Sequence, residues 1–222
     1  MRARSSVHRT LTALSDYGFV VQGGNRGSYR LGPAAFALAQ RTPSINEITA
    51  TYRPALMEIT AQTQLSSYLM MRSGLMTICV DQQIGEIFAQ PYVSGLGGRI
   101  PLGVGVSGVV ILGQMEPRSR KRAFEMLEGK WAEWDLKPET IRREVDEFQL
   151  RGHMRGIRRS HGIESLTLST PVLSDGWSGL EAAISVLAPL NVLNEAQQDE
   201  TLALMRAAFA RAEDVSTKLR KI

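Results

Sequence analysis

The sequence predicts an α+β chain with two parts, each of which combines helix and strand. In the first part, a stretch with apolar residues at helical spacing is followed at once by two short extended segments around a glycine-rich turn. In the second part, the apolar period changes from helical to extended at Leu65, and helices flank the strands at both ends. The 222 residues, 43% hydrophobic and 22% charged, suit a globular protein with two small domains or one large domain.

A helix is predicted at the start of the chain, with Ser5 or Ser6 as its cap and Gly18 as its end, just past Tyr17. Three apolar residues recur at helical spacing and form an inward stripe: Val7, Leu11 and Leu14. The outer face carries side chains that can donate hydrogen bonds to phosphates or base edges: Ser5, Ser6, His8, Arg9 and Thr12.

A two-strand hairpin is predicted directly after this helix. Residues 19–21 and 28–31 are its strands, and the glycine-rich stretch 23–27 supplies the turn, with Arg26 at its tip. A helix followed by such a wing has the shape of a winged helix-turn-helix reading head. On this interpretation Ser5, Ser6, His8 and Arg9 face the major groove, and Arg26 reaches the backbone or minor groove. For His8, a surface histidine without a role is the alternative.

The excess positive charge of the chain lies in this first segment. Residues 1–41 contain six arginines and one acidic residue, Asp16, for a net charge of +5, whereas the whole chain has +4. A basic segment of this kind is typical of nucleic-acid binding. A merely solvated basic terminus is the alternative, but the helix and wing favour double-stranded DNA as a partner.

Two helices and a group of strands are predicted next. Pro43 ends the first of these helices, Pro54 interrupts or kinks the second, and the extended period begins at Leu65. In order, the predicted elements are helices at 33–40 and 45–64, strands at 66–72 and 75–83, and a weaker strand at 86–93.

The remainder of the chain returns to helices and then to strands. The predicted elements are helices at 104–115 and from Pro117 to about Leu127, a loop at 131–134 anchored by two tryptophans, a helix at 138–151, strands at 154–157, 165–173 and 180–187, and a final helix from Asn191 or Asn194 toward Lys218. Helix 138–151 has clear boundaries, because Pro138 suits a first turn and Gly152 ends a helix. Strands flanked by helices indicate a sheet-centred α+β sensor domain.

The stretch SSVHRTLTALSDYGFVVQ, followed by YRLG, resembles the recognition helix and wing of IclR-type bacterial transcriptional regulators. Later segments resemble the same family, so the resemblance covers nearly the whole chain. It implies a partial winged helix-turn-helix at 1–41, a linker helix at 42–64 and a GAF-like effector-binding domain at 65–222. The family places a first helix and most of a second before the recognition helix, and this chain has four residues before Ser5. We therefore expect the reading head to be incomplete.

A glycine-rich stretch, GRIPLGVGVSGVVILG at residues 98–113, is the leading candidate for a ligand site. Small residues let a backbone approach a ligand closely, and a helix starting near Val106 would point free amides at an anion. The stretch has no Walker or dinucleotide fingerprint. A tight turn into a buried apolar helix explains the same residues without a ligand.

The resemblance to IclR-type regulators favours the ligand site. It implies that main-chain amides at this loop hold small carboxylate effectors, and that polar residues on two later strands face the same pocket. The effector-binding residues that the resemblance implies are Leu102, Val106, Ser107, Thr167 and Ser185.

The chain departs from the family pattern near these strands. Where the family often has an acidic cluster, this chain has four basic residues: Arg155, Arg158, Arg159 and His161. Leu187 stands in place of a second serine. We therefore expect a less acidic, more apolar pocket whose effector is a larger organic anion, such as an aromatic acid. The alternative is that Arg158 and Arg159 form a solvated face.

Residues for catalysis or metal binding do not occur at the required spacings. The three histidines and Cys79 match no metal-ligand motif, and Gly105-Val106-Ser107-Gly108 is one residue short of a Gly-x-Ser-x-Gly elbow. We therefore expect no enzyme activity, no catalytic residue, no metal and no cofactor. A single cysteine and the lack of an apolar span predict a cytoplasmic protein with no membrane partner.

The predicted function is that of a ligand-responsive, DNA-binding transcriptional regulator of the IclR type. It would act on a double-stranded operator as a homodimer or homotetramer, with a small organic acid as its effector. The alternative is a small-molecule sensor without autonomous DNA binding, because missing first helices would leave Val7, Leu11 and Leu14 partly uncovered.

Overall fold

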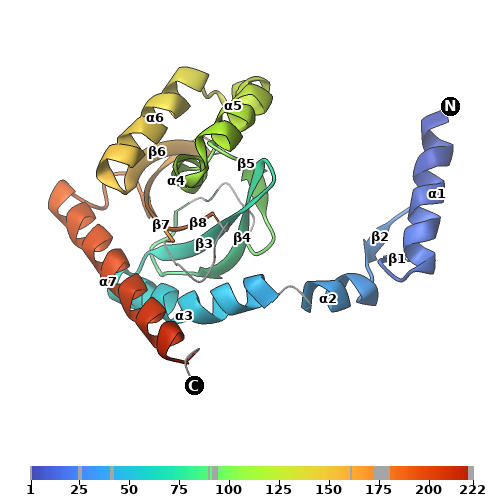
Figure 1. The fold of residues 1–222 in the computed structure, drawn as a ribbon, viewed down its shortest axis with the longest axis horizontal. Coiled ribbons are helices and arrows are strands. Elements are labelled where there is room, and N and C mark those ends of the chain that lie inside the picture. The colour runs from blue at the N-terminus through green and yellow to red at the C-terminus, as the bar shows by residue number, and fades with distance from the viewer. Residues whose placement is uncertain are drawn as a thin grey trace. The chain divides into compact units, whose positions relative to one another are not determined.

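The computed structural model describes residues 2–24, 27–40, 43–89, 91, 95–160, 162–172 and 181–219. Contacts divide the chain into two compact units, residues 1–48 and 49–222. The first unit contains helices and a two-stranded hairpin, and the second contains a six-stranded sheet with its helices (Figure 1). The predicted α+β class is confirmed.

The first helix, α1 (Arg2–Asp16), begins earlier than predicted. Ser5 and Ser6 lie inside it and do not cap it, because the arginines and alanine before them are favourable helix formers. The end of α1 agrees with the prediction: Gly18 has a φ of +71°, the left-handed conformation that glycine adopts at helix C-termini.

The apolar stripe predicted to face inward on α1 is largely exposed. Val7 is 58% exposed and Leu14 37%, whereas Leu11 is half-buried. The hairpin packed against α1 has strands of only three residues each, β1 (Val20–Gln22) and β2 (Tyr29–Leu31), so it covers a small part of the helix. The prediction of a buried stripe is therefore wrong for Val7 and Leu14 within this unit.

The predicted wing is confirmed as an antiparallel hairpin in which Val21 lies opposite Arg30. The amide of Gly23 donates to the Ser28 carbonyl at 2.8 Å, which closes the pair next to the turn. The predicted tip residue, Arg26, lies outside the described residues. The alanine-rich helix α2 (Pro33–Gln40) follows directly, as predicted.

Helix α3 (Pro43–Thr63) continues through Pro54, so the interruption is wrong, and the kink predicted as the other outcome stays a prediction. Pro54 lies on the exposed side of α3, where water can satisfy the carbonyl that lacks an amide partner. In the second unit, α3 packs against the sheet, and the Ser67 hydroxyl donates to the Leu56 carbonyl at 3.1 Å.

The sheet of the second unit has the strand order β5-β4-β3-β8-β7-β6, and every neighbouring pair is antiparallel. Its strands are β3 (Ser66–Ser73), β4 (Met76–Gln83), β5 (Arg99–Pro101), β6 (Met154–Ser160), β7 (Ile163–Pro171) and β8 (Ala182–Pro189). The strand predicted at 86–93 is wrong over its described residues, where Ile87 makes an isolated bridge to Leu65. At Gly85 a Cβ would lie 2.2 Å from the Gln64 carbonyl oxygen, so the two backbones nearly touch there.

Helices cover both faces of this sheet (Figure 1). Helix α4 (Val106–Gln114) lies against one face, with α5 (Pro117–Trp131) and α6 (Pro138–Arg151) beyond it. Helix α7 (Glu195–Leu219) lies on the other face with α3. Because α4 is enclosed between sheet and helices, it is buried from Val106 to Leu112 and is apolar on all sides.

Two boundaries in this unit refine the predictions. The stretch 131–134 was expected to be a loop, but Trp131 is the fully buried last residue of α5 and Ala132–Trp134 form a 3-10 turn. The final helix is capped by Asn194, one of the two predicted caps. Asn194 and Gln197 each accept a hydrogen bond from the other's amide at 2.9 Å, a capping box.

Candidate functional site

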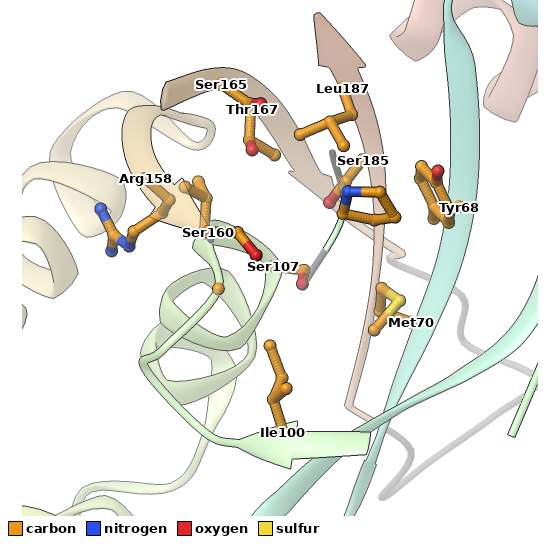
Figure 2. A pocket seen from close by; sticks show the side chains of 13 residues that line it. Tyr68, Met70, Ile100, Ser107, Arg158, Ser160, Ser165, Thr167, Ser185 and Leu187 are labelled. Atoms are coloured by element: carbon orange, nitrogen blue, oxygen red, sulfur yellow. The ribbon is translucent and has the colours of Figure 1, made fainter. Parts of the chain in front are cut away.

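A pocket opens between the start of α4 and strands β3, β6, β7 and β8 (Figure 2). Its empty space, including the part open to solvent, is about 530 Å³. Hydroxyl-bearing side chains in the lining are Tyr68, Ser107, Ser160, Ser165, Thr167 and Ser185. Apolar side chains in the lining are Met70, Pro91, Ile100, Val106 and Leu187.

Four of the five predicted effector-binding residues lie in this one pocket: Val106, Ser107, Thr167 and Ser185. They come from α4, β7 and β8, which are far apart in the sequence. The fifth, Leu102, is fully buried outside the lining. Its carbonyl accepts a hydrogen bond from the Trp131 indole at 2.7 Å, so Leu102 anchors the loop that leads to the pocket.

The start of α4 offers backbone donors to the pocket. The cap residue Gly105 is extended (φ −87°, ψ 156°) and makes no side-chain cap. The Gly105 carbonyl already accepts from the amides of Gly108 and Val109, at 2.9 and 3.3 Å. The amides of Val106 and Ser107 precede those of Gly108 and Val109, and the helix has no earlier turn whose carbonyls could accept their hydrogen bonds. With the positive end of the helix dipole, they make a suitable site for an anion.

The glycines of this loop also serve close packing. Gly103 has a φ of +85°, and a Cβ there would lie 3.0 Å from the Trp131 indole nitrogen and 3.1 Å from Ile141 Cγ2. A Cβ on Gly108 would lie 2.6 Å from the amide nitrogen of Gly103. The turn into a buried helix, expected as the alternative to a ligand site, is therefore present together with the pocket.

Hydroxyl groups on β7 and β8 face the pocket in a defined arrangement. The Ser185 hydroxyl donates to Ser169 Oγ at 2.9 Å, and Ser169 donates to the Ile184 carbonyl at 3.2 Å. This chain of bonds fixes the oxygen of Ser185. Ser165 is 3% exposed, and its hydroxyl has no hydrogen-bond partner among the described residues. The wall therefore retains unused hydrogen-bonding capacity.

Arg158 is buried, so a solvated face is wrong for this residue. It is 7% exposed, and its guanidinium donates to both carboxylate oxygens of Glu144 on α6, at 2.9 and 2.5 Å. Arg159 fits the solvated alternative, since it is exposed and pairs with Glu164 at 2.9 Å. Arg155 pairs with Asp199, and His161 lies outside the described residues.

The lining of the pocket is close to neutral. Its described residues include no carboxylate, and the charge of Arg158 is met by Glu144. Burial raises the pKa of Tyr68 above its ordinary value, which keeps its phenol protonated, although a hydrogen bond with Ser66 acts in the opposite direction. This agrees with the expectation of a less acidic pocket.

The predicted DNA-reading residues lie on α1 where the structure describes them. Ser6, His8 and Arg9 are exposed. The His8 carbonyl accepts a hydrogen bond from the Thr12 hydroxyl at 2.9 Å, within the helix. The side chain of Ser5 and all of Arg26 lie outside the described residues. Contact of these five residues with DNA stays a prediction.

Sequence reasoning missed several lining residues. Tyr68 and Met70 are two residues apart on β3, and Ser165 and Thr167 are two residues apart on β7, so each pair lies on one face of its strand. Because side chains two apart in a strand share a face, Thr167 could have identified Ser165. No local pattern identifies Ser160 or Arg158, whose positions depend on the pairing of β6 with β7.

The described part of the chain has neither a candidate metal-binding cluster nor a helix suited to span a membrane. No three histidine, cysteine, aspartate or glutamate residues there are grouped closely enough to hold a metal ion. Among the described helices, none is both long and apolar enough to cross a membrane.

Comparison with known proteins identifies relatives of the whole chain. No family model matches it. The HTH-type transcriptional regulator Rv1719 of Mycobacterium tuberculosis is 27% identical over 205 residues, which cover 82% of this chain and 75% of that protein.

Solved structures share the fold. An IclR homolog from Microbacterium hydrocarbonoxydans, complexed with 4-hydroxybenzoate, has a TM-score of 0.74 at 19% identity, over 98% of this chain and 86% of its own. An IclR family transcriptional regulator from Brucella abortus has a TM-score of 0.76 at 17% identity, over 95% of this chain and 79% of its own. The chain therefore has the α+β fold of IclR regulators of known structure, and its sequence is similar to that of a curated HTH-type transcriptional regulator.

Proposed function

We propose that the pocket at the start of α4 senses a small organic acid, of the aromatic class, and that this sensing controls binding to an operator. The observation that carries the proposal is the pair of amides, on Val106 and Ser107, at the uncapped start of α4. A carboxylate there would gain charge-assisted hydrogen bonds and the helix dipole, and no acidic side chain in the described lining would repel it.

The remaining lining suits an aromatic ring with a polar substituent. Figure 2 shows Tyr68 and Met70 on one side of the pocket and Ser160 and Thr167 on the other. A methionine sulfur and a tyrosine ring make favourable contacts with aromatic rings, while hydroxyls can bond a substituent. The IclR homolog from Microbacterium hydrocarbonoxydans, complexed with 4-hydroxybenzoate, has the same fold and supports this class.

The two-unit organisation of the chain supports a coupling of ligand binding to DNA binding. In a homodimer or homotetramer, ligand binding in the sheet domains would change the relative placement of two reading heads, so that half-site spacing no longer fits. The residues that would read DNA are Ser5, Ser6, His8, Arg9 and Arg26. Thermodynamic linkage requires the operator to change ligand affinity by the same factor.

A second candidate function is a sensor without autonomous DNA binding. The exposure of Val7 and Leu14 favours it, because an uncovered apolar face weakens the fold of the reading head. The salt dependence of duplex binding separates the two functions. A working head gives a steep loss of affinity with salt, whereas a sensor alone binds negligibly even at low salt.

Isothermal titration calorimetry tests the ligand class. The panel contains benzoate, 4-hydroxybenzoate and pyruvate as acids, with 4-hydroxybenzamide and glucose as neutral controls. We expect an aromatic acid to bind about tenfold or more tightly than its amide, because charged groups strengthen hydrogen bonds to the amides. Tight binding of glucose with no binding of the carboxylates would contradict the proposal.

A further inference from the structure

Arg158 lines the pocket with its stem, but its charged end lies elsewhere. Figure 2 shows the guanidinium directed away from Ser107 and Ser185. Its Nε donates to the Val104 carbonyl at 2.8 Å, and Nη1 donates to the Ile157 carbonyl at 3.2 Å. Arg158 is thus buried in protein contacts at the edge of a ligand site.

The hydrogen-bonding capacity of this guanidinium is nearly used up. Glu144 accepts from Nη1 and Nη2, so the protein itself engages four of the five N–H groups. The bidentate pairing with Glu144 also cancels the charge. Arg158 therefore has little left with which to bind an effector directly.

The contact with Val104 lies close in the chain to the amides that are proposed to bind an anion. Val104 lies two residues before Val106, in the loop whose other end is held by the bond from Trp131 to the Leu102 carbonyl. Without the bond from Arg158, the second half of this loop would lose its side-chain anchor in β6.

Strand β6 is shaped to bring this anchor close to α4. A Cβ on Gly156 would lie 2.6 Å from Val106 Cγ2 and 3.4 Å from Arg158 Nη1. The missing side chain therefore makes room for Val106 at the start of α4, whereas the guanidinium lies at ordinary van der Waals distance from the Cβ position.

We propose that Arg158 is a positioning residue, which holds the Val104 carbonyl so that the amides of Val106 and Ser107 are fixed toward a bound carboxylate. The inference rests on the proposed function of the pocket. Glu144 has the supporting role, because its carboxylate compensates the charge of Arg158 and allows the guanidinium to be buried between β6 and α6.

The variant Arg158→Lys separates positioning from charge compensation. An ammonium group can pair with Glu144, but it lacks the planar fork that reaches Glu144 and Val104 at once. The matched control is Arg159→Lys, on the same strand, where the side chain is exposed and pairs with Glu164.

Calorimetry with 4-hydroxybenzoate and 4-hydroxybenzamide gives the ratio of acid affinity to amide affinity, which decides between the two roles. In Arg158→Lys we expect the acid to lose about tenfold in affinity while the amide changes little, because misplaced amides weaken recognition of the anionic group. Arg159→Lys should keep the ratio of the unmodified protein. If the ratio of acid affinity to amide affinity is unchanged in Arg158→Lys, including the case where both affinities fall by the same factor, the positioning role is overturned.

Amide hydrogen exchange provides a test that needs no ligand. The amides of Gly108 and Val109 donate to the Gly105 carbonyl, next to the proposed anchor. In Arg158→Lys we expect these two amide hydrogens to exchange with solvent about tenfold faster, and the amide hydrogens of β8 serve as the internal reference. If the unmodified protein binds neither ligand, the proposed function fails. Exchange alone then decides whether Arg158 holds the start of α4, and unchanged exchange rates overturn that anchoring.

Discussion

Gly156 on β6 and Val106 at the start of α4 approach each other so closely that a Cβ on Gly156 would lie 2.6 Å from Val106 Cγ2. Real Cβ atoms essentially never come this near another heavy atom, so with a side chain at 156 the Val106 side chain, α4 or β6 would have to shift. Since Val106 also lines the pocket, this contact links the packing of the sheet to the geometry of the ligand site.

Gly156→Ala should therefore impair both stability and ligand binding. We expect a loss of about 1–3 kcal/mol in the free energy of unfolding from overpacking, with weaker binding of aromatic acids. Urea unfolding and calorimetry measure the two effects. Gly129→Ala is the control, because Gly129 lies in α5 with open space around its Cβ position, and it should stabilise by up to about 1 kcal/mol. Similar unfolding free energies for the two variants would show that the contact at 156 relaxes freely.

The anion-binding role of the backbone is tested by Val106→Pro. Proline fits the first position of a helix, and the extended Gly105 (ψ 156°) suits the residue before a proline. The change removes one amide donor and leaves α4 intact, so acid affinity should fall about tenfold or more by calorimetry. Val106→Ala keeps the amide and should bind acids more tightly than Val106→Pro. The reverse order would exclude the amide as a ligand donor.

The reading head is tested by Arg9→Ala. If exposed Arg9 contacts a phosphate, its removal should reduce the slope of log affinity against log salt by about one unit. Fluorescence anisotropy with a labelled duplex over a salt series measures the slope. Arg143→Ala, an exposed change on α6, should leave it unchanged. Equal slopes for the two variants would remove Arg9 from the interface.

Cys79 makes the free energy of unfolding depend on pH in the alkaline range. Burial, and to a lesser extent the nearby charge of Asp81, raises the pKa of this thiol from 9.0 to about 12. The unfolded chain loses the proton first, so the thiol's contribution to stability is complete below pH 9. It declines as the pH rises toward 12, by at most about 1.4 kcal/mol per pH unit. Urea unfolding at pH 8, 9 and 10 should show a shallower decline for Cys79→Ala than for the unmodified chain. Parallel declines would contradict the raised pKa.

Local patterns predicted most elements correctly because their causes are local. Pro138 and Gly152 bound α6 as expected, and Asn194 caps α7, since caps and prolines act within one helical turn. Val106, Ser107, Thr167 and Ser185 meet in one pocket as the family resemblance implied, although nothing in their spacing shows that β7 and β8 pair in the required register.

The errors arose where distant parts of the chain decide the outcome. For Arg158 the sequence left a solvated face open as an alternative, which is wrong because the burial of this residue depends on Glu144 on another element. The apolar spacing of Val7 and Leu14 is correct for a helix, yet spacing alone does not supply the surface that would cover them. The strand expected at 86–93 lacks the long-range partner that a strand requires along its described residues.

The most direct test of the central claim is the affinity of the whole chain for a duplex, selected from genomic fragments by the protein itself, with and without 4-hydroxybenzoate. Fluorescence anisotropy at fixed salt measures DNA binding, and calorimetry measures acid binding with and without the duplex. We predict that acid and DNA change each other's affinity by the same factor, as linkage requires. If the acid occupies the pocket and leaves DNA affinity unchanged, the chain is not a ligand-responsive regulator for that acid.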